Sequence, residues 1–215
     1  MYTPDTPYEE EIKDLGKSCH QFGLESKFYP IKNLKDWVRN TQQKASVIQQ
    51  ALEEFECDVV WLDADAVILK KLELFEDLAK NNDFHLCIHR AYYESTEKEA
   101  NTSNLYIQLK NKVSAALKKN RHPKGEILSG TIYFNNSIKT KQLVDEWVEL
   151  NKHKIEWDQR TLQEVIDRDG SPYIVQQLPR SYVKIVPRHQ TLNDLDDGNN
   201  HIGHKQLSRI YKNKL

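Results

Sequence analysis

Short apolar segments alternate with amphipathic segments of helical period along this chain, and no other feature restricts its fold so strongly. Apolar side chains recur every three or four residues in the segments expected to form helices, at residues 8–22, 42–55, 72–80, 104–119, 139–151 and 158–167. β-Branched and aromatic side chains gather in the segments expected to form strands, at residues 26–31, 58–62, 84–89, 127–134, 173–178 and 182–186. This alternation predicts an α/β fold with a mostly parallel central sheet flanked by helices.

Composition excludes several classes of protein. A chain of 215 residues suits one domain with a substantial core, and its apolar runs are far shorter than the roughly 20 residues of a transmembrane helix. The 31 Lys and Arg residues balance 32 Asp and Glu residues, which argues against a dedicated nucleic-acid binder. Cys19, Cys57 and Cys87 are far apart, which indicates neither a disulfide framework nor a cysteine zinc site. Together with a polar N-terminal segment, these features predict a cytoplasmic protein without a membrane-spanning segment.

The most informative motif lies where the apolar run at residues 59–62 ends and Asp63-Ala64-Asp65 begins. A strand this apolar is buried, so the two acids emerge at the rim of the sheet, where α/β proteins bind polar ligands. Two carboxylates this close repel each other unless a cation lies between them. Mg²⁺ and Mn²⁺ prefer carboxylate and phosphate oxygens, which makes Asp63 and Asp65 candidate metal ligands. The competing interpretation is structural, with Asp65 capping the turn into the next helix.

Two classes of enzyme place such a pair of acids directly after an apolar strand. One class is the nucleotide-sugar glycosyltransferases of the GT-A fold. The other is the haloacid-dehalogenase-like phosphatases, whose D-x-D-x-[TV] motif matches residues 63–67 and would make Asp63 a covalent nucleophile. Three observations disfavour the phosphatase. A long segment precedes the motif, the later acids Asp196 and Asp197 lie in polar sequence, and no lysine candidate is clear on a loop after Ser129.

Further motifs follow one another along nearly the whole chain. They begin with Tyr2-Thr3-Pro4, Tyr8 and the segment from Trp37 to Lys44, which reads W-V-R-N-T-Q-Q-K. After Asp63 and Asp65 come Leu128-Ser129-Gly130-Thr131, then Asp158-Gln159, and last His204-Lys205-Gln206-Leu207-Ser208-Arg209. In this order and spacing the chain resembles the nucleotide-diphospho-sugar transferase family of GT-A glycosyltransferases.

The resemblance implies a single GT-A, Rossmann-like domain over residues 1–215. It implies transfer of a sugar from a nucleotide-diphospho-sugar, with a UDP-sugar as the expected donor, to an acceptor hydroxyl. The implied cofactor is Mn²⁺ or Mg²⁺, held by Asp63, Asp65 and His204, with His201 competing for the third place. The residues implied around the donor are Tyr2, Thr3, Tyr8, Lys44, Asp63, Ala64, Asp65, Ser129, Gly130, Lys205 and Arg209.

Side-chain chemistry agrees with these implied roles. The ammonium of Lys44, just inside a helix, would contact a phosphate, and Lys205 and Arg209 would clamp the diphosphate. Gly130 would let the donor sugar approach the backbone beside Ser129. The alternative for each of these residues is a solvated side chain or an ordinary turn.

Asp158 is the expected catalytic residue, together with Gln159. In an inverting transferase its carboxylate would deprotonate the acceptor hydroxyl, whereas in a retaining transferase it would stabilise the positive charge that develops on the sugar. Gln159 would hydrogen-bond the donor. The sequence leaves retention and inversion open, and Asp158 would need no function if it served only as a helix N-cap.

Two segments complete the expected organisation. Residues 94–126 form a basic helical insertion, in which six Lys and Arg residues and no acid lie between positions 110 and 124. Such a run usually forms a solvated helix face, although it would also suit an anionic acceptor such as DNA. Residues 201–215 form a basic C-terminal tail that closes over the donor site, after a loop at 193–203. The acceptor (glycan, small molecule or modified DNA base) and the oligomeric state stay open, and a non-catalytic nucleotide-sugar-binding module is a further alternative.

Overall fold

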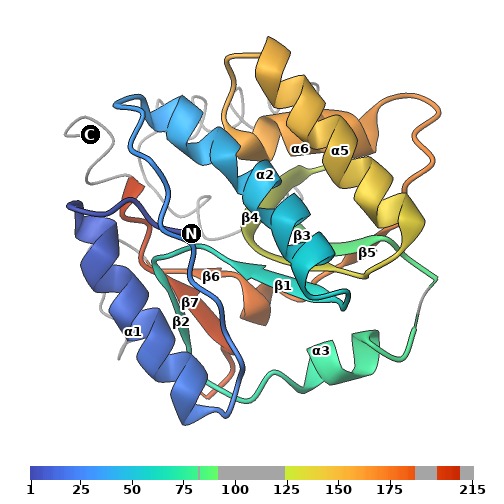
Figure 1. Cartoon of the computed structure of the whole chain (residues 1–215). Coiled ribbons are helices and arrows are strands. Elements are labelled where there is room, and N and C mark those ends of the chain that lie inside the picture. Colours follow the sequence, from blue (N-terminus) through green and yellow to red (C-terminus); the bar gives the residue numbers. More distant parts are fainter. Residues whose placement is uncertain (82, 92–123, 187–197, 209–215) are drawn as a thin grey trace, which may run out of the picture.

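The computed structural model describes residues 1–81, 83–91, 124–186 and 198–208, which form an α/β structure with helices around two sheets (Figure 1). The helices are α1 (Pro7–Gln21), α2 (Trp37–Glu54), α3 (Glu73–Leu78), α5 (Ile138–His153) and α6 (Asp158–Asp167), with a 3₁₀ turn, η2, at Arg180–Tyr182. The strands are β1 (Val59–Leu62), β2 (Ala66–Ile68), β3 (Leu86–Ala91), β4 (Glu126–Phe134), β5 (Val175–Gln177), β6 (Lys184–Ile185) and β7 (Ile202–His204). The alternation of helices and strands expected from the sequence is confirmed.

The main sheet has the strand order β1-β4-β3-β5. β4 runs antiparallel to both of its neighbours, whereas β3 and β5 pair in parallel. The sheet is therefore mixed and not mostly parallel, although β1, β3 and β5 share one direction. The apolar pattern alone does not reveal this, because β4 is covered on both faces and reads like a buried parallel strand.

The register between β3 and β4 shifts at one point. Ile88 lies opposite Ile132, whereas His89 lies opposite Leu128, so residues 129–131 have no partner on β3. A bulge of this kind disrupts the ladder locally and redirects the side chains of the longer strand. The bulged residues are the Ser-Gly-Thr segment that the sequence analysis singled out.

A second, small sheet has the strand order β2-β7-β6. β2 begins directly after Asp65, and β7 pairs with it in antiparallel orientation, with Ile68 opposite Ile202. The prediction of a loop at 193–203 is wrong for its last two residues, which belong to β7. The sequence analysis predicted no strand at the position of β2. Three-residue strands carry almost no periodic signal, and their pairing joins distant parts of the chain.

Two clusters of buried apolar side chains cover the two faces of the main sheet. The first contains Ile132 and Phe134 of β4 together with side chains of α2, α5 and α6. The second contains Tyr133 of β4 together with side chains of α1, α3 and β2. Since neighbouring residues of a strand point to opposite faces, α2, α5 and α6 cover one face, and α1, α3 and the small sheet cover the other (Figure 1).

Local sequence signals explain several helix starts. Asp36 caps α2 by accepting the Arg39 N–H at 3.0 Å, and Ser137 caps α5 by accepting the Thr140 N–H at 3.1 Å. α1 begins with a proline in its first turn, where the missing N–H costs nothing. The Asp36 cap fixes the start of α2, and α2 carries Lys44, one of the central residues of the site.

The strand expected at residues 26–31 is not formed as a regular element. A single bridge joins Tyr2 to Pro30, with the Tyr2 N–H donating to Tyr29 and the Ile31 N–H donating to Tyr2, both at 2.9 Å. Pro30 has no N–H, so a longer ladder cannot continue through it. The segment lies extended beside the N-terminal residues without joining a sheet.

Several expectations fall outside the described residues. They are the helix at 104–119, most of the insertion at 94–126, the first part of the loop at 193–203, and Arg209. Within the described ranges, no helix combines the length and apolar character needed to cross a membrane.

Candidate active site

Asp63 and Asp65 lie in the turn that joins the two sheets, between the end of β1 and the start of β2. Backbone hydrogen bonds fix this turn, because the Asp63 N–H donates to the Gly130 carbonyl and the Ala66 N–H donates to the Asp63 carbonyl, both at 2.9 Å. The Asp63 side chain is 36% exposed, whereas Asp65 is buried. The capping interpretation of Asp65 is wrong, because α3 begins after Leu72 without a side-chain cap. The two acids therefore stand at the junction of the main and small sheets.

The ammonium of Lys44 lies between two carboxylates. Its Nζ is 2.9 Å from Asp63 Oδ1 and 2.6 Å from Asp158 Oδ2. It also donates to the carbonyl of Ser129 at 3.2 Å and to the Ser129 Oγ at 3.3 Å. Lys44 is only 3% exposed, because it shares the buried face of α2 with the apolar residues of that helix. The structure thus joins three residues that the sequence analysis treated separately.

Asp158 is the first residue of α6, where the helix dipole favours a negative charge. The N-cap residue is Trp157, so the Asp158 side chain serves a purpose other than capping. Its Oδ2 accepts from Lys44 and from the Ser129 Oγ, the latter at 3.2 Å. Its Oδ1 has no hydrogen-bond or ion-pair partner in the part of the chain that the structure describes. Asp158 is therefore a buried carboxylate with one oxygen held and one oxygen unpaired.

Gln159 lies beside the same bulged segment. Its Oε1 accepts the Ser129 N–H at 3.3 Å, and its Nε2 donates to Glu126 at 3.2 Å. Both residues expected to be catalytic, Asp158 and Gln159, therefore contact Ser129 from the start of α6.

The charges of this cluster reinforce one another. Burial alone would lower the pKa of Lys44, but the carboxylates of Asp158 and Asp63 outweigh burial and raise that pKa above its ordinary value. Burial alone would raise the pKa of Asp63, but the charge of Lys44 and its hydrogen bond lower it. Burial, Asp65 and Asp63 together raise the pKa of the Tyr8 hydroxyl, which stays protonated at neutral pH. The cluster thus holds charged Lys44 and Asp63 beside a neutral phenol.

His204, on β7, lies on the other side of the acidic turn. Its Nδ1 is 3.8 Å from Asp65 Oδ1, and its Nε2 is 2.9 Å from the Thr131 Oγ1. The ring packs so closely on Gly130 that an added Cβ there would lie 2.9 Å from the imidazole Cε1. Asp65 is held in turn by the Leu207 N–H, which donates to Oδ2 at 2.9 Å. The imidazole and the second acid are therefore locked side by side.

His201, the competing third ligand, faces a different partner. Its ring stacks on Tyr182 with the ring centroids 4.4 Å apart, and burial lowers its pKa. Of the two histidines, His204 is the one that lies beside Asp65.

The donor atoms at this turn suit a divalent cation in their chemistry. Asp65 Oδ1 and His204 Nδ1 are 3.8 Å apart, which exceeds the roughly 3 Å between neighbouring ligands of an octahedral ion bound at about 2.1 Å, so the two groups would have to move closer to share a cation. If Nε2 of His204 donates its proton to Thr131, the lone pair of Nδ1 faces Asp65. Across the described ranges no three acid, imidazole or thiol groups already converge on one point, because Asp63 is turned toward Lys44. Its Oδ2 has no partner within the described residues and would be the third donor if a cation bound at this turn.

The N-terminal residues expected around the sugar donor lie at different distances from the acidic turn. Tyr8, on α1, is close enough to Asp63 and Asp65 for their charges to raise its pKa. Thr3 is buried, and its carbonyl accepts the Thr6 hydroxyl at 2.6 Å. Tyr2 forms the bridge to the extended segment described above. Of these residues, Tyr8 is the one near enough to Asp63 and Asp65 for their charges to act on its hydroxyl.

The other expected donor residues are also placed unevenly. Ala64 is buried in the acidic turn. The Lys205 N–H donates to the Asp65 carbonyl at 3.1 Å, but its ammonium pairs with Glu11 and with Asp14, the latter at 3.0 Å, on α1. Lys205 therefore ties the C-terminal segment to α1. Arg209 lies outside the described residues.

The sequence analysis missed Trp61. Its Nε1 donates to Asp63 Oδ1 at 2.9 Å, and the ammonium of Lys44 lies 5.4 Å from the centre of its ring. A signal was present, because Trp61 and Asp63 are two residues apart at the end of a strand and so point to the same face. The Asp63-Ala64-Asp65 motif identified the two acids but not Trp61, whose indole N–H holds the Asp63 side chain.

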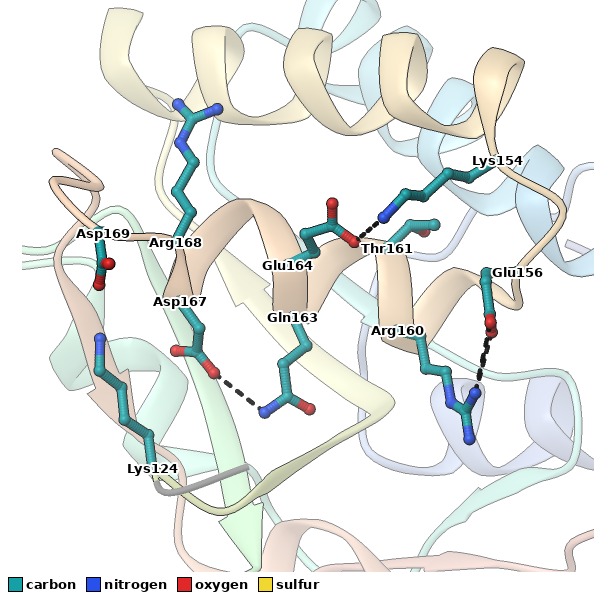
Figure 2. A pocket seen from close by; sticks show the side chains of 10 residues that line it. All are labelled: Lys124, Lys154, Glu156, Arg160, Thr161, Gln163, Glu164, Asp167, Arg168 and Asp169. Carbon is teal, nitrogen blue, oxygen red and sulfur yellow. Dashed lines mark hydrogen bonds and ion pairs between the residues drawn. The ribbon is translucent and has the colours of Figure 1, made fainter. Parts of the chain in front are cut away.

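A separate pocket of about 520 Å³ lies along α6 (Figure 2). Its charged lining residues are four cations and four acids: Lys124, Lys154, Arg160, Arg168, Glu156, Glu164, Asp167 and Asp169. Figure 2 shows Lys154 directed at Glu164 and Arg160 at Glu156, and both are ion pairs. The pocket is thus close to neutral and contains none of the residues of the acidic turn.

The sequence profile of the nucleotide-diphospho-sugar transferases matches residues 1–210. The chain belongs to the nucleotide-diphospho-sugar transferase family. No curated protein sequence matches this transferase. The family assignment makes it a glycosyltransferase and disagrees with the phosphatase alternative.

Three solved glycosyltransferase structures are similar to this chain to different degrees, and the first of them shows the same fold. A glycosyltransferase involved in glycosylating the major capsid of PBCV-1 is 15% identical, with a TM-score of 0.61 over 98% of this chain and 93% of that chain. GlyE of Streptococcus pneumoniae TIGR4 is 16% identical, with a TM-score of 0.49 over 94% of this chain and 53% of that chain. The galactosyltransferase LgtC, solved with donor and acceptor sugar analogues, is 12% identical, with a TM-score of 0.46 over 94% of this chain and 84% of that chain. The GT-A fold expected from the sequence is confirmed.

Proposed function

We propose that this transferase moves a sugar from a UDP-sugar to an acceptor hydroxyl with the help of Mn²⁺ or Mg²⁺. One observation carries the proposal: a buried imidazole and a buried carboxylate, His204 and Asp65, lie 3.8 Å apart beside Asp63 at the end of β1. Carboxylate oxygens suit hard divalent cations, and an imidazole shifts the preference toward Mn²⁺.

Asp63, Asp65 and His204 are the proposed ligands of the cation. When bound, the cation neutralises the negative charge that develops on the departing nucleoside diphosphate. The protein contributes rigidity, because the Leu207 N–H holds Asp65 and the Thr131 hydroxyl holds the imidazole. Such outer contacts orient ligands and raise the affinity for the metal.

Asp158 acts at the sugar in this proposal. Its unpaired Oδ1 is available either to accept the proton of the acceptor hydroxyl or to stabilise positive charge on the anomeric carbon. Gln159 and Ser129 fix the floor of the donor-sugar site through their mutual hydrogen bond. The geometry supports a role at the reaction centre but is compatible with inversion and with retention.

The donor site continues from the acidic turn along the N-terminal segment. Tyr2, Thr3 and Tyr8 line its nucleotide end, and Ala64, Ser129 and Gly130 supply backbone groups nearer the sugar. Lys205 and Arg209 belong to the C-terminal segment that closes the diphosphate end. We propose a cytoplasmic location for this activity, with a glycan, a small molecule or a modified DNA base as the acceptor.

The test combines ligand binding with turnover. Thermal unfolding of the full chain is followed with a panel of nucleotide sugars, with and without Mn²⁺, and release of nucleoside diphosphate is then measured with the donor that stabilises most. We expect a UDP-sugar to raise the melting temperature only with the metal present. No stabilisation and no turnover with any donor would contradict the proposal and favour a non-catalytic module.

A single substitution makes the test specific. Asp63→Asn should lower kcat at least about 100-fold while leaving the fold intact, because it removes a charged ligand from a partly exposed turn. Asp77→Asn is the matched control, since Asp77 lies on α3 with its side chain 72% exposed. Normal transfer by Asp63→Asn at saturating Mn²⁺ would show that the acidic turn is not the metal site.

A further inference from the structure

Lys44 has an environment unlike that of a lysine that binds a diphosphate. Such a lysine presents free N–H groups to an open site, whereas Lys44 is 3% exposed. Its Nζ already has four protein oxygens between 2.6 and 3.3 Å away. Two of these oxygens, both of Ser129, accept hydrogen bonds, and the other two belong to carboxylates that form ion pairs with the ammonium. An ammonium has three N–H donors, so protein oxygens already surround this group where a phosphate would have to bind.

The same ammonium determines which oxygen of each acid is available. Asp63 Oδ1 accepts from Lys44 and from the Trp61 indole, and Asp158 Oδ2 accepts from Lys44 and from the Ser129 hydroxyl. The second oxygen of each acid, Asp63 Oδ2 and Asp158 Oδ1, has no partner within the described part of the chain. Each carboxylate therefore has one oxygen fixed by the protein and one oxygen without a partner among the described residues.

We propose that Lys44 is a positioning residue that orients Asp63 toward the metal and Asp158 toward the sugar, and that it does not bind the diphosphate itself. This inference rests on the proposed function, since that function gives the two acids their roles. In this arrangement the buried ammonium of Lys44 connects Asp63, the proposed metal ligand, with Asp158, the residue proposed to act at the sugar.

Electrostatics explain why one lysine serves both acids. Two carboxylates and one ammonium leave a net charge of −1, which a divalent cation at Asp63 can then compensate. Without Lys44, two neighbouring carboxylates would face each other in a largely buried site, and at least one would reorient or bind a proton. The Trp61 ring, 5.4 Å from Nζ, covers the ammonium and hinders its replacement by water.

The test compares Lys44→Met and Lys44→Arg with the unchanged full-length chain. Four constants are measured for each protein: the affinity for Mn²⁺ and the affinity for UDP at saturating Mn²⁺, both by calorimetry, and kcat and KM for the donor at the same Mn²⁺ concentration. We expect Lys44→Met to lower kcat at least about 100-fold and to weaken Mn²⁺ binding about 10-fold or more, while the affinity for UDP and the donor KM at saturating Mn²⁺ change less than about threefold. Lys44→Arg keeps a cation between the acids and should recover at least a tenth of the lost kcat. Lys152→Met, on the exposed side of α5, is the control and should change none of these constants.

Each other outcome overturns a defined part of the reasoning. If Lys44→Met weakens UDP binding as much as it lowers kcat, Lys44 is a diphosphate contact and this inference is wrong, although the proposed function stands. If the unchanged chain neither binds UDP with Mn²⁺ nor turns over any donor, the proposed function fails and the inference fails with it. Should Lys44→Met not fold, Lys44→Arg decides alone: unchanged UDP affinity with a lowered kcat supports positioning, and lost UDP affinity refutes it.

Discussion

Gly130→Ala is the substitution whose effect the structure defines most closely. A Cβ at this position would lie 2.9 Å from Cε1 and 3.0 Å from Nδ1 of His204, well inside ordinary van der Waals contact. The ring is held between Thr131 at Nε2 and Asp65 near Nδ1, so it cannot move away without losing at least one of these contacts. The substitution therefore displaces the imidazole without removing any side chain of the site.

The expected size of this effect follows from the two contacts at risk. Overpacking of a buried contact costs about 1–3 kcal/mol, and loss of the Thr131 hydrogen bond costs about 1 kcal/mol, so the free energy of unfolding should fall by about 2–4 kcal/mol. Displacement of an orienting contact typically lowers metal affinity about 10- to 100-fold. Urea unfolding measures the first quantity, and titration of the metal-free protein with Mn²⁺ measures the second.

Gly16→Ala provides the matched control. An added Cβ at Gly16 on α1 would lie 3.4 Å from the Phe28 ring, which is an ordinary contact, and alanine favours a helix over glycine by about 1 kcal/mol. This variant should unfold at the same or a slightly higher urea concentration, with unchanged Mn²⁺ affinity. If Gly130→Ala binds Mn²⁺ as tightly as Gly16→Ala does, His204 is not a metal ligand.

Two further predictions concern stability away from the acidic turn. Burial lowers the pKa of His89 in the folded protein, so the unfolded chain binds a proton at this residue more readily. The stability contributed by neutral His89 is therefore present above about pH 6.5, the pKa of an unperturbed histidine. This stability is lost as the pH falls below that value. His89→Gln should therefore reduce the fall in melting temperature between pH 7.5 and pH 5. The control is His153→Gln, whose side chain is 73% exposed and which should leave this fall unchanged. An equal fall in both variants would show that His89 does not cause the pH dependence. Lys205→Ala breaks two ion pairs to α1 with a side chain only 21% exposed and should cost about 1 kcal/mol in urea unfolding. Lys13→Ala, in an exposed pair, should cost less than Lys205→Ala, and an equal loss in both variants would mean that the partly buried pair adds nothing.

The helices and the acidic turn were predictable because both depend on local signals. Apolar periodicity located α1 and α6 within a few residues, and an apolar run followed by acids located the turn after β1. The expectation that this run is buried was wrong, because β1 is an edge strand in which Trp61 is buried and Val60 is exposed. The small sheet was not predictable, because β2 and β7 are three-residue strands whose pairing joins distant segments. The direction of β4 was missed for a related reason: side-chain pattern reports burial and not strand orientation.

The contacts of the site were harder to predict than its members. Lys44, Asp158 and Ser129 were each singled out, yet nothing in the sequence indicated that one ammonium would contact the other two residues and Asp63 as well. Whether a helix lysine is solvated or buried depends on what packs against it, and here α6 and β4 cover it. The inferred role of Lys44 therefore required the three-dimensional arrangement.

The bulge in β4 explains how these contacts come together. Residues 129–131 have no partners on β3, so Ser129 can face Asp158 and Lys44 while Thr131, two residues later, faces His204. In a regular strand these two side chains would share one face. Gly130 lies between them, where the imidazole packs directly on its backbone and leaves no space for a side chain. A glycine inside an otherwise apolar strand often marks such a bulge, so Gly130 carried the one local signal for the centre of the site.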